Sequence, residues 1–204
     1  MSLTSSTYLG VPVLDSITGA DAPAEDSPSR RITVLGGPGP FGLDAHEALQ
    51  RYRRTLLIQC FNATEVDEVY AFMDARLGRL RPFWLPTWDM DLTVNSYIAA
   101  SVDLAIEYCG YSSLMFPLGA SRRHIQVTSP SGTIYRRRIT GATWATGPEA
   151  LVLSAAIAEG LPAGTRIGFL RYCHLDDDIA KMAFAGGYAE CELPVIELPQ
   201  ECPT

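Results

Sequence analysis

The sequence predicts a mainly β protein of the α+β class: an antiparallel β-sandwich or split barrel with one amphipathic helix and an inserted small β-subdomain. Two observations lead to this prediction. From about residue 97 onward, short β-prone runs alternate with turn residues, a spacing typical of antiparallel sandwiches and small barrels. Only residues 63–77 combine apolar side chains at helical spacing with recognisable start and stop signals.

The composition limits the possible functions. A chain of 204 residues that is 47% hydrophobic can bury a core as one domain, or as one domain carrying an insertion. The net charge of −7 disfavours nucleic-acid and anionic-membrane partners, since both need a basic surface. The five cysteines form no C-x-x-C pair, so we expect reduced thiols in a protein made in the cytosol. We expect no signal peptide and no membrane-spanning segment.

Residues 1–29 are rich in small and polar side chains and predict a flexible or arm-like segment. Within it, residues 8–14 (YLGVPVL) are apolar enough to add an edge strand to a larger sheet. Tyr8, Val11 and Val13 are therefore candidate contacts with a neighbouring subunit. A frayed terminus is the other interpretation, and both stay open.

Residues 30–35 predict a short strand that ends in GGPGPFG, residues 36–42. This run matches G-x-G-x-x-G at Gly37, Gly39 and Gly42. A phosphate-binding loop needs free backbone N–H groups, and Pro38 and Pro40 remove two of them. We interpret the run as a stiff turn.

The predicted helix follows a buried strand at residues 52–61. Asn62 is the expected N-cap, Glu65 completes a capping box, and Gly78 is the expected stop. The predicted apolar stripe consists of Val66, Val69, Tyr70, Met73 and Leu77.

Residues 79–88 concentrate aromatic and proline side chains, with Phe83, Trp84 and Trp88 beside Pro82 and Pro86. Two prolines favour an edge strand or a strand at a bulge. The aromatic side chains are candidate anchors for another subunit, or the lid of the local core.

Later strands are expected at residues 101–108, 124–128, 133–140, 150–155, 166–172 and 189–198, with a hairpin turn at residues 130–132. In the last strand, Ala189, Cys191, Leu193 and Val195 share one face, but Ile196 and Leu198 lie on the other. We therefore predict a bulge beside Pro194 on an edge strand.

The candidate residues for chemistry form no recognisable site. Cys173 and His174 precede three aspartates at residues 176–178, but the run lacks the register of a calcium loop. Asp89 and Asp91 would share a strand face, yet paired acids also fit strand ends or arginine partners. No G-x-S-x-G or H-E-x-x-H motif occurs. We therefore expect no enzyme activity, no cofactor and no metal.

Three consecutive arginines occupy the strand predicted at residues 133–140. Alternation places Arg136 and Arg138 on one face and Arg137 on the other. If the strand is half-buried, these cations need acidic partners within the subunit or across an interface. Salt bridges between subunits are the predicted role of Arg136 and Arg138.

Several phrases of the chain resemble tail-tip proteins of long-tailed bacteriophages, in the distal-tail and minor-tail group. The phrases are TLLIQCF at residues 55–61, FMDARLGR at 72–79, FWLPTW at 83–88 and AECELPVIEL at 189–198. The match implies a core β-domain of residues 30–97 and 171–204, with residues 98–170 as an inserted barrel-like subdomain.

The resemblance implies a structural protein of the virion that forms a hexameric or trimeric ring at the tail tip. The ring would connect the tail tube protein to hub, baseplate, tape-measure or fibre proteins, after synthesis in the host bacterial cytoplasm. A tail-hub or tail-completion component is an alternative. A cell-wall-degrading or carbohydrate-binding tail module is an alternative of another class, in which Trp84 and Trp88 would stack on sugars.

Overall fold

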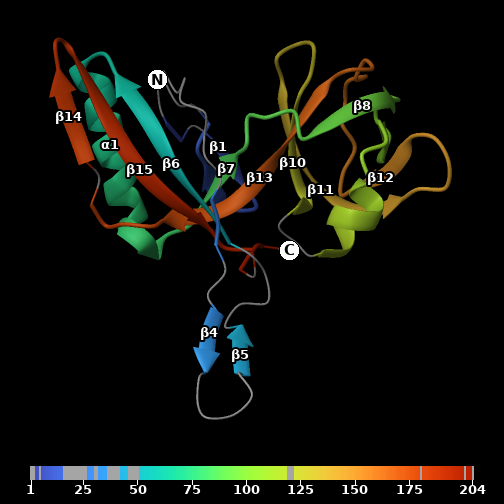
Figure 1. Ribbon diagram of the computed structural model, residues 1–204. Coiled ribbons are helices and arrows are strands. Elements are labelled where there is room, and N and C mark those ends of the chain that lie inside the picture. Colours follow the sequence, from blue (N-terminus) through green and yellow to red (C-terminus); the bar gives the residue numbers. More distant parts are fainter. Residues whose placement is uncertain are drawn as a thin grey trace. The chain divides into compact units, whose positions relative to one another are not determined.

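A computed structural model describes residues 3–4, 6–15, 27–29, 32–35, 42–45, 51–118, 122–179, 181–199 and 201–203 (Figure 1). The chain is mostly β, with one main helix and a closed six-stranded antiparallel barrel plus further strands. The predicted fold class is confirmed. The glycine-proline turn predicted at residues 36–42 lies outside the described residues, except for Gly42 in β5.

The strands are β1 (Ser6–Tyr8), β2 (Val11–Val13), β3 (Ser27–Ser29), β4 (Ile32–Leu35), β5 (Gly42–Ala45), β6 (Arg51–Cys60), β7 (Phe83–Pro86), β8 (Leu92–Tyr97), β9 (Asp103–Ile106), β10 (His124–Thr128), β11 (Ile134–Thr143), β12 (Glu149–Leu153), β13 (Arg166–Leu175), β14 (Lys181–Ala185) and β15 (Tyr188–Glu197). The helical segments are α1 (Ala63–Arg76), the 3₁₀ turns η1 (Gly78–Leu80) and η3 (Phe116–Leu118), and the π-helix η2 (Tyr111–Met115).

The chain divides into two compact units. The helical unit comprises Met1–Thr7, Leu14–Phe83 and Tyr172–Glu201, and the barrel unit comprises Tyr8–Val13, Trp84–Arg171 and Cys202–Thr204. Strands β9 to β12 and the first part of β13 lie within residues 98–170, the predicted insertion, whereas β8 precedes it.

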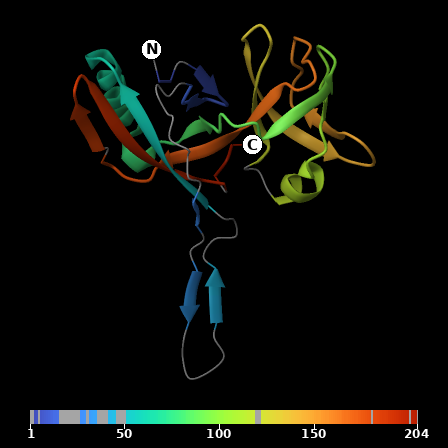
Figure 2. The same ribbon diagram turned by 45° about the horizontal axis from the view of Figure 1, so that its top comes forward.

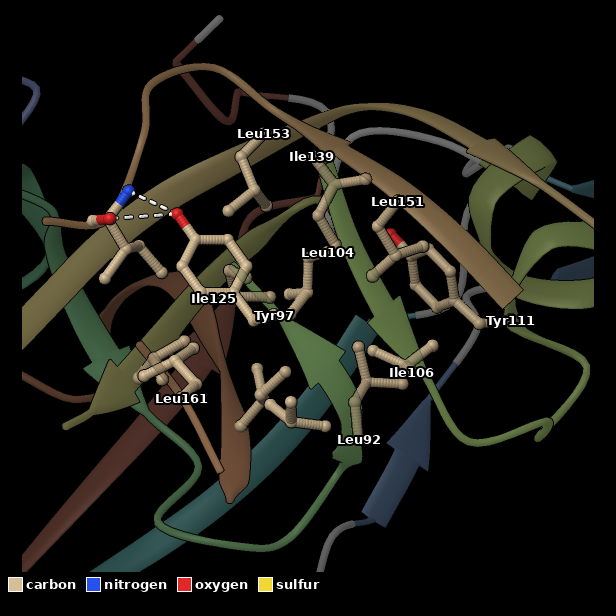
Figure 3. Packing of buried hydrophobic residues seen from close by; sticks show 14 of the residues in the cluster. Leu92, Tyr97, Leu104, Ile106, Tyr111, Ile125, Ile139, Leu151, Leu153 and Leu161 are labelled. Atoms are coloured by element: carbon tan, nitrogen blue, oxygen red, sulfur yellow. Dashed lines mark hydrogen bonds between the residues drawn. The ribbon is translucent and has the colours of Figure 1, made fainter. Parts of the chain in front are cut away.

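The barrel is formed by β8, β9, β12, β11, β10 and β13, and the pairing of β13 with β8 closes it. Alternate side chains of its strands point into the barrel and form its core. In β12, Leu151 and Leu153 are buried while Ala150 and Val152 face outward. The Tyr97 hydroxyl accepts from Ile157 N (2.8 Å) and so ties the loop after β12 to the core (Figure 3). Figure 3 labels ten members of the core: Leu92, Tyr97, Leu104, Ile106, Tyr111, Ile125, Ile139, Leu151, Leu153 and Leu161.

The helical unit is built on a sheet with the order β14, β15, β6, β3. Strand β15 pairs with β6 along most of its length, from Ala189 opposite Cys60 to Ile196 opposite Arg53. Helix α1 lies beside β6 and β15 (Figure 2). Its Phe72 ring meets the Phe83 ring edge-on, with 5.2 Å between centroids.

Helix α1 begins where the sequence predicts. The Asn62 side chain accepts from Glu65 N (3.0 Å), and the Glu65 carboxylate accepts from Phe61 N (2.7 Å). The helix also ends as predicted: Leu77 is the C-cap, and Gly78 follows it as the C′ residue with a left-handed φ of +61°. Leu77 is left-handed as well (φ +50°), and a Cβ at Gly78 would lie 2.1 Å from Asp178 Oδ1.

The predicted apolar stripe of α1 is partly wrong. Val69 is buried as expected, but Tyr70 and Leu77 are exposed. Phe72, which the stripe omitted, is buried against Phe83. The buried face of α1 is therefore the one that carries Val69 and Phe72, and it packs against Phe83.

Replacing Asn62 with alanine is expected to lower the free energy of unfolding by about 1 kcal/mol, because Glu65 N would lose its acceptor at the helix start. Urea denaturation followed by circular dichroism measures the change. Thr64→Ala, in the exposed first turn, is the control and should shift stability by less than about 0.5 kcal/mol.

Two predictions about edge strands are wrong. Strand β15 lies between β14 and β6, and its register against β6 runs without a shift past Pro194, so neither the edge position nor the bulge is present. Pro194 falls between the residues of β15 that pair with β14 and those that pair with β13, where its missing N–H leaves no ladder bond broken. Strand β7 is likewise internal, between β2 and β13. Its two prolines are compatible with this position because Pro82 precedes the strand and Pro86 is its last residue.

Candidate functional site

The predicted interface residues differ greatly in exposure. Phe83, Trp84 and Val13 are fully buried within the chain, whereas Tyr8 and Val11 are half-buried. Val13 pairs with Trp84 in the parallel β2–β7 ladder. Of the aromatic side chains at residues 83–88, only Trp88 offers surface, with 43% of its area exposed. Subunit contacts through these residues stay a prediction, and Trp88 is the aromatic side chain available for one.

Four of the predicted residues meet around a histidine that the sequence did not single out. The Tyr8 hydroxyl lies 3.1 Å from His124 Nδ1, and the Trp84 indole donates to the Tyr8 carbonyl (2.9 Å). The Trp84 and His124 rings lie 4.7 Å apart, and Arg138 is the β11 residue opposite His124. Together with Val13 beside Trp84, these residues form a cluster around the buried rings of Trp84 and His124 inside the barrel unit.

Burial controls the protonation of this cluster. Burial, followed by the positive charge of Arg138, lowers the pKa of His124 to about 4. Burial also raises the pKa of Tyr8 to about 12. Both groups are therefore neutral at pH 7, and the cluster is suited to packing.

The arginines of β11 bond to neutral oxygens in the barrel unit. Arg136 Nε donates to the Gln126 side-chain oxygen (2.9 Å). Arg137 donates to the carbonyls of Ala155 (3.0 Å) and Ala156 (2.8 Å). The predicted salt bridges of Arg136 and Arg138 to another subunit stay a prediction.

Asp89 and Asp91 lie on the loop between β7 and β8, not on a strand face as the sequence suggested. The Asp91 carboxylate accepts from Phe169 N (2.7 Å) and from the Thr87 hydroxyl. It is thereby engaged in holding the loop to β13, as a cap would be. Asp89 is exposed beside Trp88.

The cluster of Cys173, His174 and three aspartates is split by the fold. Cys173 is buried in β13, and the aspartates follow the end of that strand. Asp176 lies 3.4 Å from Arg53, and Asp178 accepts from Arg79 N (3.1 Å). Within the described part of the chain, no three His, Cys, Asp or Glu side chains are grouped as metal ligands.

A buried glutamate was missed at the sequence level. Glu149 Oε1 accepts from the backbone N–H groups of Cys109 (2.9 Å), Gly110 (2.6 Å) and Tyr111 (3.0 Å), and Oε2 accepts from Ser112 N (2.6 Å). The Glu149 carboxylate therefore caps the start of the π-helix η2. Its place on the face of β12 that carries Leu151 and Leu153 was the available signal, because an acid on a core face needs a partner.

The outer strand of the helical unit's sheet was also missed. Among the described strands β14 pairs only with β15, so its other side is an open edge. It carries Phe184, which is 69% exposed. Phe184 lines a groove of ≈ 390 Å³ that Cys60, Val66 and the β14–β15 turn also border. We call this strand and its groove the β14 edge.

The opposite edge of the same sheet is protected. Strand β3 has three residues and carries Pro28 opposite Tyr52. Short length and proline are two devices by which edge strands avoid pairing with another chain. The β14 edge has five residues and no proline, so it is the open end of this sheet.

Comparisons with known proteins add no family: neither the protein-family models nor the curated proteins give a match. None of the described helices is both long and apolar enough to cross a bilayer.

Proposed function

We propose that this protein is a structural component of a phage tail tip, the distal tail protein, which forms a ring that connects the tail tube to the hub, baseplate or fibres. The observation that carries the proposal is the β14 edge, an unprotected strand that presents an exposed phenylalanine. The resemblance of residues 52–91 and 189–198 to tail-tip proteins supports the same function. The partners proposed are other copies of the chain, the tail tube protein, and hub, tape-measure or fibre proteins.

The β14 edge suits contact with a second copy of the chain. An incoming strand would bond to the free N–H and C=O groups of β14, and Phe184 would be buried against that neighbour. If the incoming strand belongs to a different surface of the next copy, the contact is head-to-tail. Contacts of this head-to-tail type generate closed rings when the rotation closes.

The test is the Phe184→Asp variant of the full chain. Placing a charge on the β14 edge is expected to weaken each subunit contact by about 2 kcal/mol or more, because the aromatic anchor is lost and a carboxylate must be desolvated. Light scattering coupled to size exclusion should show a ring for the native protein and monomers for the variant. Electron microscopy of tails should place the native ring at the end of the tube.

Leu80→Asp is the matched control, since Leu80 is 77% exposed on η1 of the same unit and lies outside the groove. This variant should still form rings. A native protein that is strictly monomeric and absent from tails would overturn the proposed function. Rings that persist in Phe184→Asp would overturn only the role of the β14 edge.

A further inference from the structure

The barrel unit contains a cleft of ≈ 510 Å³ that the ring function does not use. Its walls come from the loop after β7, from β10 and from β13, and they include Trp88, Asp89, Gln126, Thr128, Arg166 and Gly168. The volume lies within the roughly 300–1,000 Å³ of typical small-molecule sites. The cleft is therefore large enough for a ligand of a few rings.

Trp88 borders this cleft in a conformation that is unfavourable for its residue type. Its φ of +56° is in the left-handed region, which glycine adopts freely and a bulky side chain rarely does. The indole gains little packing in return, since nearly half of its surface is exposed. Backbone strain held at an exposed aromatic residue is typical of a ligand-binding position.

The loop that carries Trp88 is fixed on both sides. Thr87 N donates to the Phe169 carbonyl (3.0 Å), and Asp91 N donates to the Ile167 carbonyl (3.1 Å). Gly168 lets the loop approach β13 closely, because a Cβ there would lie 3.1 Å from Thr87 Oγ1 and 3.3 Å from the Asp89 carbonyl oxygen. The backbone at Trp88 is thus held in place before any ligand arrives.

Four polar side chains of the cleft are available for hydrogen bonding. Within the part of the chain that the structure describes, the side chains of Asp89, Thr128 and Arg166 have no hydrogen-bond or ion-pair partner. Gln126 uses its oxygen to accept from Arg136, which leaves its amide N–H donors uncommitted there. The cleft therefore offers a carboxylate acceptor, a guanidinium donor, an amide donor and a hydroxyl.

The geometry points to a saccharide-binding site, in which a sugar ring stacks on Trp88 and its hydroxyls bond to Asp89, Gln126, Thr128 and Arg166. A sugar ring has an apolar C–H face and rim hydroxyls that both donate and accept, which matches an aromatic platform beside mixed donors and acceptors. The opposite charges of Asp89 and Arg166 disfavour a phosphate ligand, and the polar lining disfavours a lipid chain. Trp84, the other tryptophan of this segment, is fully buried and takes no part.

The test uses the full-length protein on an array of neutral, N-acetylated and uronic-acid oligosaccharides, followed by titration of the best probe with tryptophan fluorescence. Trp88→Gly should weaken binding by roughly tenfold or more, because the stacking surface is lost. The same variant should keep or raise the melting temperature, since glycine relieves the positive φ. A residue needed for packing alone would lower the melting temperature instead.

Trp144→Ala is the matched control: Trp144 is 49% exposed in the same unit and packs against Tyr108 in a tilted ring pair outside the cleft. It should bind the probe as the native protein does. Asp89→Asn should weaken binding without changing the fold. Binding that is absent from the whole array, or equal in Trp88→Gly and native protein, would overturn the site. Repeating the titration with Phe184→Asp separates this result from ring formation.

Discussion

Replacing Glu149 with alanine is expected to lower the free energy of unfolding by about 3–5 kcal/mol, the largest effect that we predict for a single side chain. The carboxylate is fully buried and accepts four backbone N–H bonds from residues 109–112. Alanine would leave these donors without an acceptor at the start of η2. Because native domains are stable by only roughly 5–15 kcal/mol, the barrel unit should become marginal.

The Glu149→Gln variant tests the charge separately from the shape. Glutamine keeps the size of the side chain, but its NH₂ group would face donors that now contact a carboxylate oxygen. We expect an intermediate loss of stability. Glu107→Gln, at an exposed acid following β9, is the control and should change stability by less than about 0.5 kcal/mol. Urea denaturation at pH 7 measures all three, and equal stability of Glu149→Ala and native protein would contradict the role of Glu149.

The same carboxylate makes stability depend on pH in a defined direction. Burial raises the pKa of Glu149, but the backbone N–H bonds from Ser112, Cys109 and Gly110 outweigh burial and lower it below the ordinary value of 4.5. A lowered carboxyl pKa stabilises the fold above the unfolded pKa, and this stability is lost as the pH falls through the folded pKa. Glu149→Gln should remove this contribution, and with it the loss of stability that the native protein shows as the pH falls below 4.5.

The sequence predicted local structure better than it predicted which strands pair with each other. The cap of α1 was readable because Asn62 and Glu65 bond within four residues of each other. Strand β10 was also placed with its observed bounds. The neighbours of β7 and β15 were not readable, because β7 pairs with β2 and β13, and β15 pairs with β6, which lie far away in the chain. Strand β14, which directly precedes β15, was not predicted. Prolines were therefore interpreted as edge signals in strands that turned out to be internal.

The candidate sites show the same limit. Trp84 and Trp88 stand four residues apart and look equivalent in the sequence, yet one is buried by β2 and His124 while the other borders a cleft. Phe184 gave no signal because β14 was not predicted at all. Glu149 did give one, through its place on an apolar strand face. Exposure separates candidate sites from core residues, and it is set by tertiary contacts.

His124 is expected to make the barrel unit less stable by about 3 kcal/mol between pH 7 and pH 4, since its pKa falls from 6.5 to about 4 on folding. Stability falls on acidification because the folded protein favours the neutral form of His124. Burial and the charges of Arg138 and Arg123 disfavour the imidazolium, and the Pro203 carbonyl favours it only in part. The unfolded chain therefore binds a proton more readily below pH 6.5, and stability falls as the pH drops towards 4.

The His124→Gln variant removes this titration while it leaves an oxygen or amide able to bond to the Tyr8 hydroxyl. Its free energy of unfolding should be lower than that of the native protein at pH 7, because the contact with the Trp84 ring is lost. Between pH 6.5 and 4, however, its stability should change less than the native value does. Urea denaturation followed by tryptophan fluorescence over this range measures both slopes. Glu149→Gln is the control: it lowers stability at every pH, but it changes the pH dependence only below pH 4.5 and should keep the native slope above that value. Because the two proteins differ only at residue 124, equal slopes for the native protein and His124→Gln would show that the buried histidine does not control acid stability.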